Sequence, residues 1–430
     1  MAKKIILSEH QSSVFNDLIE SIDTTLGLGQ RAMFSLTGPA GCGKTVLTSE
    51  LISYLLKHYA HKKLKLTTPT HTSLGVAKDM VSKSNSKHKN FSFGTIHSHL
   101  KLKMETKEDK VNFLLIDESS MISEEIFNHI KSQVNRGITE IVIFIGDKVQ
   151  LPPIDSKENS VFNGIQQFKL TEVVRQAMDN PLLKKATEIR YAIEAYQDKG
   201  TVLDRSILNF KDYKSDEGIT VFSDFQEWLS VYINATTDKT LSAYTNHTVV
   251  SYNEFNRKIH LGLKNPPYLV PGDVVVLQSA YSSGMNSATN GSTLVVDDPW
   301  MSVHDVLKLN YWEFTCEDYG DLIIKVLDPS SKDRYDTLLQ KISAGAKKLK
   351  ADKDHLGAKN MWEKFWKVKN EFVEIKYNYA HTIHKLQGST YEEVYINMKD
   401  VLDNVYDDIV LFHLIYVALT RASLQVLMLV

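Results

Sequence analysis

A complete phosphate-binding loop is the feature that most restricts how this chain can fold. Gly38 to Thr45 read Gly-Pro-Ala-Gly-Cys-Gly-Lys-Thr, which matches the pattern G-x-x-x-x-G-K-[ST]. The apolar run Ala32 to Thr37 suits a buried strand, and apolar residues recur at helical spacing from Val46 to Leu56, so the glycines fall at a strand-to-helix turn. Backbone amides at such a turn point at phosphate oxygens, a lysine adds positive charge, and a threonine hydroxyl suits Mg²⁺. The residues expected to bind the nucleotide are Gly38, Pro39, Ala40, Gly41, Cys42, Gly43, Lys44 and Thr45.

Length and composition favour a soluble globular protein of two or three domains. A chain of 430 residues is too long for one compact core, and 43% hydrophobic residues suffice to fill several. The net charge of -2 neither indicates nor excludes a nucleic-acid partner, because a binding groove can be basic locally. The two cysteines, Cys42 and Cys316, argue against a disulfide framework or a structural zinc site and fit a reducing cytosol. We expect neither export nor membrane insertion, because the chain lacks a long apolar run and a signal-peptide pattern at Met1 to Leu7.

The pattern along the chain predicts two α/β lobes. After the loop, short apolar runs alternate with helix-like stretches, which is typical of a parallel sheet covered by helices. The predicted strands of this first lobe are 64–66, 113–116 and 141–145. A second α/β pattern has strands at 241–244, 394–398 and 424–429, with a helix around 411–422. Between about 290 and 370 the chain is first β-rich and then lysine-rich, and we interpret this stretch as an inserted accessory domain.

Two carboxylates at the end of a predicted strand suit nucleotide hydrolysis. Asp117 and Glu118 follow four apolar residues, which places one carboxylate near the expected Mg²⁺ and the other near the γ-phosphate. The second could then orient and deprotonate the attacking water. The alternative is an ordinary acidic pair at a strand end. Gln150, near the end of the next strand, could sense the γ-phosphate.

Eight motifs in order and spacing resemble those of superfamily-one helicases of the 5′-to-3′ branch. Within that branch, the chain is most similar to the Dda-like helicases of T-even bacteriophages, over nearly its whole length. The motifs are 38–45, 68–71, 95–97, 117–119, 146–152, 171–175, 380–388 and 416–421. The resemblance implies two RecA-like parallel-sheet lobes, with a short pin insertion in the first and a β-rich accessory domain inserted in the second. The implied boundaries are 1–180 for the first lobe with a pin at 98–112, 181–285 and 376–430 for the second lobe, and 286–375 for the accessory domain with its helical extension.

The resemblance also implies roles around the nucleotide. Gln11 corresponds to the adenine-reading glutamine of the family, although an exposed helix glutamine is the alternative. Arg175 and Arg421 correspond to the two arginines that reach the γ-phosphate, where a planar charged fork stabilises developing negative charge. A surface arginine is the alternative for each. Gln387 and Gly388 are implied as further nucleotide-binding residues.

Polar residues on both lobes resemble the family's nucleic-acid motifs. Hydroxyls, imidazoles and a lysine suit contacts to phosphate and sugar, which set position without reading sequence. The near-copies Thr-Ile-His at 95–97 and 382–384 favour DNA contact over buried structural histidines. The implied DNA-contacting residues are Thr68, Pro69, Thr70, His71, Thr95, His97, Thr245, Asn246, His381, Thr382, His384 and Lys385.

Two features of the accessory region are interpreted as structural. Its lysine run, which includes Lys347, Lys348 and Lys350, is more typical of a solvated helix face than of a DNA contact. Trp362, Phe365 and Trp366 fall at i, i+3 and i+4, which favours a packed stripe over a platform for bases.

The implied function is an ATP-dependent DNA helicase that moves 5′ to 3′ on single-stranded DNA and unwinds duplexes. Its expected cofactors are ATP and Mg²⁺, and its expected substrates are single-stranded and forked duplex DNA. The resemblance adds phage replication or single-strand-binding proteins as partners and the cytoplasm of an infected bacterium as the location; we expect a monomer. The pin segment 98–112 is shorter and more charged than in the Dda-like proteins and lacks their aromatic tip. A translocase that displaces proteins without unwinding is therefore one alternative, and others are an ATP-gated nucleic-acid switch, a small-molecule kinase and an RNA motor.

Overall fold

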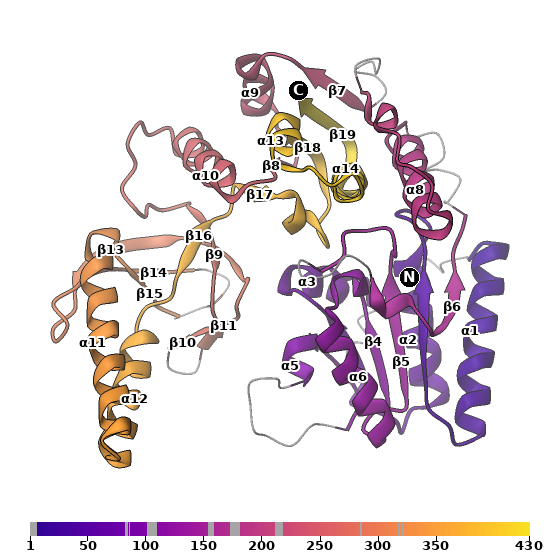
Figure 1. Cartoon of the computed structure of the whole chain (residues 1–430), viewed down its shortest axis with the longest axis horizontal. Coiled ribbons are helices and arrows are strands. Elements are labelled where there is room, and N and C mark those ends of the chain that lie inside the picture. The colour runs from indigo at the N-terminus through magenta and orange to yellow at the C-terminus, as the bar shows by residue number, and fades with distance from the viewer. Residues whose placement is uncertain are drawn as a thin grey trace. The chain divides into compact units, whose positions relative to one another are not determined.

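A computed structural model describes residues 7–81, 85, 87–100, 110–153, 159–172, 181–210, 218–283, 286–316, 319 and 322–430. The chain divides into two compact units (Figure 1). The first comprises Met1–Val249 and His381–Val430, and the second comprises Val250–Ala380.

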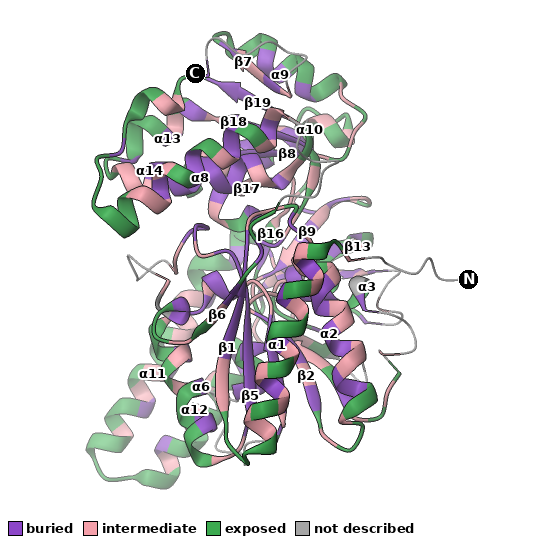
Figure 2. Ribbon diagram, turned by 90° about the vertical axis from the view of Figure 1, so that its right-hand side faces the viewer, coloured by how far each residue is buried: buried purple, intermediate pink, exposed green. Residues whose placement is uncertain are grey.

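The first unit begins with a six-stranded sheet in the order β3-β2-β4-β5-β1-β6, in which every neighbouring pair is parallel. Its central strands are apolar on both faces and fully buried, as expected for a parallel sheet with helices on each side (Figure 2). The strands are β1 (Ala32–Thr37), β2 (Leu64–Thr68), β3 (Phe91–Thr95), β4 (Phe113–Ile116), β5 (Ile141–Gly146) and β6 (Gln166–Lys169).

Helices cover both faces of this sheet because alternate strand residues point to opposite sides. One core joins Leu115 and Ile143 to the apolar faces of α1 (Glu9–Gly27), α2 (Lys44–His58) and α3 (His71–Met80). A second core joins the intervening residues of the same strands to α5 (Ile96–Leu100) and α6 (Glu124–Arg136).

A five-stranded sheet forms the second lobe of this unit, in the order β17-β8-β18-β19-β7. Its strands are β7 (Ile219–Phe222), β8 (Lys239–Ala243), β17 (Ala380–Thr382), β18 (Tyr391–Asn397) and β19 (Ala422–Leu429). The accompanying helices are α8 (Pro181–Lys199), α9 (Phe225–Asn234), the first turn of α10 (Asn246–Leu261), α13 (Met398–Asn404) and α14 (Asp408–Arg421). Helix α14 is buried around its whole circumference from Leu411 to Leu419, so it is a core helix of the unit (Figure 2).

The second unit is β-rich and carries a helical hairpin. Its three small sheets have the orders β12-β9-β16, β13-β14-β15 and β10-β11. Their strands are β9 (Val274–Leu277), β10 (Tyr281–Ser283), β11 (Asn286–Ala288), β12 (Thr293–Val295), β13 (Asp297–Val303), β14 (Asn310–Thr315), β15 (Ile324–Leu327) and β16 (Ile375–Tyr377). Helices α11 (Lys332–Ala351) and α12 (His355–Lys369) pack against each other and project as a hairpin, drawn in orange in Figure 1.

The predicted fold class is confirmed, with two parallel-sheet lobes and a β-rich accessory part. The compact accessory unit begins at Val250, earlier than residue 286, because β9 pairs with β12 and β16 of that unit. The domain boundaries therefore stay a proposal. Of the predicted pin at 98–112, residues 101–109 lie outside the described residues. Across the described ranges, no helix combines the length and apolar character needed to cross a membrane.

Candidate nucleotide-hydrolysis and nucleic-acid sites

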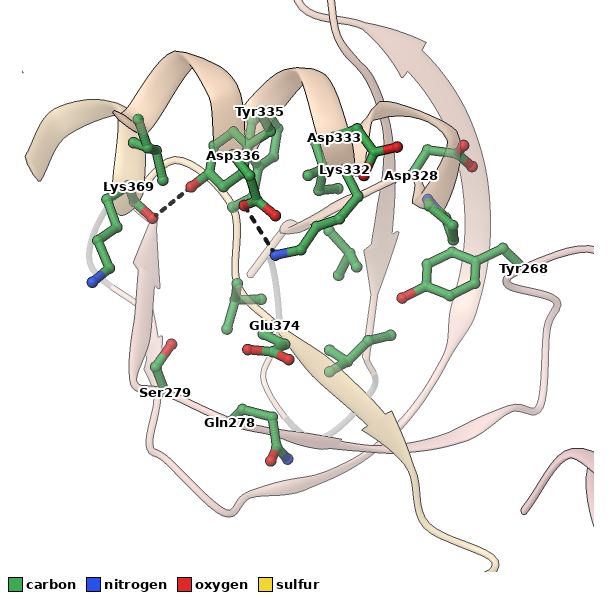
Figure 3. Close-up of a pocket in the computed structure, with 17 residues that line it drawn as sticks. Tyr268, Gln278, Ser279, Asp328, Lys332, Asp333, Tyr335, Asp336, Lys369 and Glu374 are labelled. Carbon is green, nitrogen blue, oxygen red and sulfur yellow. Dashed lines mark hydrogen bonds and ion pairs between the residues drawn. The ribbon is translucent and has the colours of Figure 1, made fainter. Parts of the chain in front are cut away.

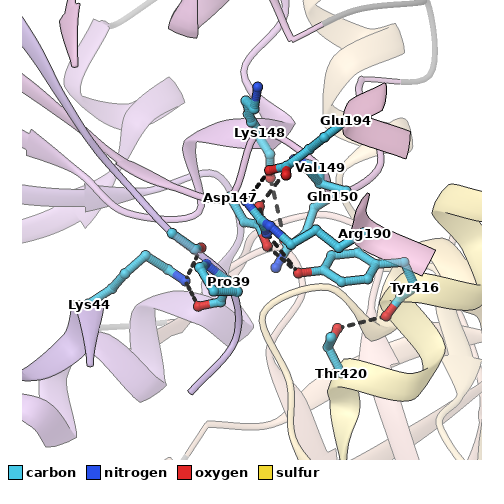
Figure 4. A network of polar contacts seen from close by, with 12 residues as sticks. Pro39, Lys44, Asp147, Lys148, Val149, Gln150, Arg190, Glu194, Tyr416 and Thr420 are labelled. Atoms are coloured by element: carbon cyan, nitrogen blue, oxygen red, sulfur yellow. Dashed lines mark hydrogen bonds and ion pairs between the residues drawn. The ribbon is translucent and has the colours of Figure 1, made fainter. Parts of the chain in front are cut away.

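The phosphate loop joins β1 to α2 and is shaped by glycines. Gly41 and Gly43 have φ values of 76° and 88°, in the left-handed region that favours glycine. A Cβ on Gly43 would also collide with the side-chain nitrogen of Gln11. The Lys44 Nζ donates to the carbonyl oxygens of Gly38 at 2.7 Å and Pro39 at 2.8 Å, so the ammonium lies across the loop (Figure 4). No side chain caps the first turn of α2, which leaves its amides directed at the loop.

Gln11 supports this loop from α1. It stands three residues after the N-cap Ser8, and the two residues form a reciprocal capping box. Its Nε2 donates to the Cys42 carbonyl oxygen at 3.0 Å, and only 7% of the residue is exposed. The alternative of an exposed helix glutamine is therefore wrong. Adenine recognition by this residue stays a prediction.

The carboxylates of Asp117 and Glu118 follow β4 in a strained turn. Glu118 has φ 51° and ψ 40°, an uncommon conformation for a residue with a side chain. The Glu118 amide donates to Asp117 Oδ1 at 2.9 Å. Burial, with the nearby Glu118 charge, raises the pKa of Asp117 to about 6. The sequence places both carboxylates correctly after a buried strand, and their catalytic roles stay predictions.

Two side chains from distant parts of the chain, Arg421 and Gln150, converge on Glu118. Arg421, at the end of α14, places Nη1 3.4 Å from Glu118 Oε1. With the amide of Gln150 oriented to satisfy its neighbours, its nitrogen donates to Glu118 Oε2 at 3.2 Å and its oxygen accepts from Arg421 Nη2 at 2.6 Å. The Arg421 Nε is buried and finds no hydrogen-bond partner within the described part of the chain. The side chains of Glu118, Gln150 and Arg421 thus form one polar cluster shared by the two lobes.

A second buried network ties the segment after β5 to the second lobe (Figure 4). Asp147 is fully buried, and its Oδ1 accepts from Arg190 Nη1 of α8 at 2.6 Å. Its Oδ2 accepts from the Tyr416 hydroxyl of α14 at 2.6 Å, and the same hydroxyl accepts from Arg190 Nη1 at 3.0 Å. Glu194 adds a contact 3.0 Å from Arg190 Nη2. Arg190 could not be predicted from the sequence, because no local pattern links a helix residue to a strand end 43 positions away.

Backbone carbonyl oxygens of the same segment are also held by the second lobe. His413 Nδ1 lies 2.7 Å from the Val149 oxygen, and Gln387 Nε2 donates to the Leu151 oxygen at 3.2 Å. Residues 147–151 therefore contact α8, α14 and the turn after β17 through side chain and backbone alike.

The threonines predicted to contact DNA hold local structure in this conformation. Thr70 Oγ1 accepts from the Ser73 amide at 3.1 Å and caps α3, and Thr95 Oγ1 accepts from the Ser98 amide at 3.3 Å. Thr245 Oγ1 lies 3.0 Å from Asp400 Oδ1, a partner that the sequence analysis missed. These hydroxyls have a structural role that sequence reasoning did not include, and their DNA contacts stay predictions.

The remaining predicted DNA residues differ in exposure. His97, Asn246 and Lys385 are exposed, and Thr382 is buried. Burial lowers the pKa of His381 to about 4, with Lys385 adding to the shift. The other predicted residues of this group are Thr68, which is buried, and Pro69, His71 and His384, which are half-buried.

Gly388, predicted to bind nucleotide, lies beside Ser73, where a Cβ would approach the Ser73 Cβ to 3.0 Å. Arg175 lies outside the described residues.

The accessory unit contains a hollow of about 770 Å³ between α11 and the strands beside it (Figure 3). Lys332 Nζ lies 3.3 Å from Asp336 Oδ1 on its wall. The charged residues that line it are Asp328, Asp333, Asp336, Glu374, Lys332 and Lys369. Four carboxylates against two lysines disfavour a polyphosphate, so this hollow does not compete with the phosphate loop as a nucleotide site.

Comparisons with known proteins agree along the chain. An AAA domain matches residues 25–156, a Dda helicase SH3 domain matches 297–377, and a UvrD-like helicase C-terminal domain matches 377–429. The ATP-dependent DNA helicase dda of Enterobacteria phage T4 is 26% identical, with 98% of each chain covered. The uncharacterized protein R530 of Acanthamoeba polyphaga mimivirus is 23% identical, over 92% of this chain and 94% of its own.

Among solved structures, the Pif1 helicase of Candida albicans has a TM-score of 0.49 at 16% identity, with 99% of this chain and 94% of that chain covered. An AAA domain followed by two helicase domains, together with a match of nearly full length to the Dda helicase, confirms the resemblance drawn from the motifs. The chain is similar to the Dda helicase over nearly its whole length, as the resemblance to superfamily-one helicases predicts.

Proposed function

We propose that this chain is an ATP-dependent DNA helicase that translocates 5′ to 3′ on single-stranded DNA and separates duplex strands. The observation that carries the proposal is the cluster of Glu118, Gln150 and Arg421, because it joins the carboxylate of one lobe to the arginine of the other. A motor needs hydrolysis to depend on how its lobes are arranged. A shared cluster at the reacting phosphate supplies that dependence.

The loop chemistry fits ATP with Mg²⁺. The left-handed glycines and uncapped amides of α2 suit phosphate oxygens, and Lys44 would exchange its carbonyl contacts for the β- and γ-phosphates. Thr45 and Asp117 supply the hard oxygen donors that Mg²⁺ prefers, and the ion would neutralise charge on the transferred phosphoryl group. Glu118 would hold the proton of the attacking water, and Gln150 would orient that water. Arg421 and Arg175 would stabilise the charge that develops on the phosphate oxygens.

The DNA track is proposed on both lobes, with the residues predicted from the sequence. His381 is neutral at physiological pH because of its lowered pKa, so it would contact phosphate or sugar as a hydrogen-bond donor and not as a charge. The lobes would close on ATP and reopen after hydrolysis. If each lobe holds the same DNA strand in turn during this cycle, the protein steps along that strand. We propose that the working form is a monomer on single-stranded or forked DNA.

The test is ATP-dependent unwinding of two matched duplexes, one with a 5′ single-stranded tail and one with a 3′ tail, with ATP turnover followed in parallel. The proposal predicts opening of the 5′-tailed duplex alone. Opening of only the 3′-tailed duplex would overturn the polarity, and turnover insensitive to DNA would overturn the motor.

The second candidate is a translocase without robust unwinding, favoured by the short charged segment 98–112. Deletion of residues 104–110 distinguishes the two candidates. A helicase that uses this segment as its pin loses unwinding but keeps DNA-stimulated turnover. A translocase stimulated by single strands opens neither tailed duplex even before the deletion.

A further inference from the structure

The helical hairpin of the accessory unit concentrates positive charge. Residues 332–369 contain eleven lysines and arginines but five aspartates and glutamates, a net charge of +6 on a chain whose net charge is -2. All eleven basic residues are exposed. Within the described residues, two of them make ion pairs, Lys332 with Asp336 at 3.3 Å and Lys359 with Glu363 at 3.9 Å. The hairpin is therefore a locally cationic surface, which the net charge of the whole chain does not indicate.

One face of α12 interleaves this charge with tryptophan. Lys359, Trp362, Trp366 and Lys369 stand at i, i+3, i+7 and i+10, so they form a single stripe about 15 Å long, which we call the α12 stripe. Trp366 is 51% exposed, and Lys369 Nζ lies 5.1 Å from its ring centroid.

Phe365 explains how the exposed Trp366 and the half-buried Trp362 are held in place. It is partly buried and packs against a hydrophobic cluster that includes Tyr335, Ile342 and Val368. Trp362 and Trp366 each meet its ring edge to face, with centroids 5.3 Å apart. The packed-stripe interpretation from the sequence therefore holds for Phe365 and is wrong for Trp366. The rings are braced from inside the hairpin, which lowers the entropy lost when a flat ligand stacks on them.

We propose that the α12 stripe is a binding site for single-stranded DNA, in addition to the track on the two lobes. The lysines suit phosphates, and an exposed indole offers a face on which an unpaired base stacks whatever its identity. A duplex buries its base faces and would leave the indole unused. An acidic peptide would pair with the lysines but has no need of the rings. The proposal rests on the proposed DNA motor function and deepens it by assigning the accessory unit a role in holding the strand.

The first experiment measures the DNA concentration that half-saturates ATP turnover of the full chain, with single strands of graded length. Trp366→Ala should leave this concentration unchanged for the shortest strands that stimulate turnover, since these occupy the track alone. For long strands it should rise roughly 5-fold or more. Trp366→Tyr, which keeps an aromatic face, should restore most of the loss.

Trp300→Ala is the matched control. Trp300 is also exposed, at 36%, but it lies on β13 beside Asp297 and Asp298 and donates to Glu313 at 2.8 Å. It should behave as the parent protein does on all strands.

Charge is tested separately by the dependence of single-strand affinity on salt. The double variant Lys359→Gln with Lys369→Gln should reduce the slope of log affinity against log salt concentration by about 1.4, because each phosphate contact on a single strand contributes about 0.7.

Three results would overturn the inference: Trp366→Ala indistinguishable from the parent on long strands, Trp366→Tyr as impaired as Trp366→Ala, or equal loss of affinity for blunt duplex and single strands. If DNA does not change the ATP turnover of the parent protein, the proposed function is overturned instead. In that case, direct binding of a labelled single strand to the parent and to Trp366→Ala would still test the α12 stripe.

Discussion

Removing one buried hydroxyl should uncouple the lobes without disturbing the phosphate loop. The Tyr416 hydroxyl donates to Asp147 at 2.6 Å and accepts from Arg190 at 3.0 Å. Burial and the Asp147 charge raise the pKa of Tyr416 well above its usual range, so the hydroxyl keeps its proton at every working pH. Tyr416→Phe removes both hydrogen bonds, while Arg190 still pairs with the buried carboxylate. A hydrogen bond to a charged group is worth about 1.5–3 kcal/mol, so the arrangement of α14 against residues 147–151 should weaken by about 2 kcal/mol.

A loss of about 2 kcal/mol lowers the equilibrium constant for the arrangement that brings Gln150 to Arg421 by about 30-fold. We expect kcat for ATP at saturating single-stranded DNA to fall by up to this factor, with nucleotide affinity unchanged because Lys44 and its loop are untouched. Turnover assays and titration with a fluorescent ATP analogue measure the two quantities.

The matched control is Tyr395→Phe. The Tyr395 hydroxyl is also buried and donates to a carboxylate, Glu393, at 2.7 Å, but it lies within the second lobe on β18. Urea unfolding should show similar destabilisation for both variants. If Tyr416→Phe hydrolyses ATP as fast as Tyr395→Phe, the network has no part in coupling and the reasoning is wrong.

Three further predictions concern single residues. Arg421→Ala should keep nucleotide affinity but abolish turnover, because a planar charge is lost from the reacting phosphate; turnover at the parental rate would contradict its role. Gln11→Ala should weaken ATP and GTP binding alike, by about 5-fold, if the residue acts through its 3.0 Å bond to the Cys42 carbonyl oxygen, whereas loss confined to ATP in equilibrium titrations would indicate adenine recognition instead. His381 has a folded-state pKa of about 4, below its unfolded value, so the unfolded chain binds the proton first and stability falls as pH drops from about 6.5 to 4. His381→Gln should flatten this decline in urea unfolding measured at pH 7 and 5, and an unchanged slope would show that the imidazole is not the group responsible.

The parts of the molecule that could be predicted from the sequence are those encoded by local patterns. The strand, glycine loop and helix around Lys44 follow from residues adjacent in the chain, and so does the placement of Asp117 after a buried apolar run. The role of Gln11 in holding the loop could not be predicted, because its partner Cys42 lies 31 positions away. The membership of β9 in the compact accessory unit could not be predicted either, since its pairing with β12 and β16 depends on contacts and not on any change of composition.

Some polar residues suit two roles equally well, so the sequence alone does not distinguish between those roles. A threonine before a helix, such as Thr70, fits both an N-cap and a DNA contact, because one hydroxyl suits either partner. The structure reveals the cap, which holds the N-terminus of α3 in place. A DNA contact there would use an oxygen with one lone pair already engaged, so replacing Thr70 would change helix stability and DNA affinity together.

Helix α14 links the polar cluster around Glu118 to the contacts between the two lobes. His413, Tyr416 and Arg421 lie on this single buried helix and contact, in turn, the Val149 carbonyl oxygen, Asp147 and Glu118. A rigid, close-packed helix cannot shift at one of these contacts without shifting at the others. Any motion of the second lobe that carries α14 must therefore move the segment that contains Gln150 and withdraw Arg421 from Glu118 together. Because the second lobe also carries half of the residues proposed to hold DNA, the proposed motor would change its grip on the strand and its geometry at the phosphate in a single step.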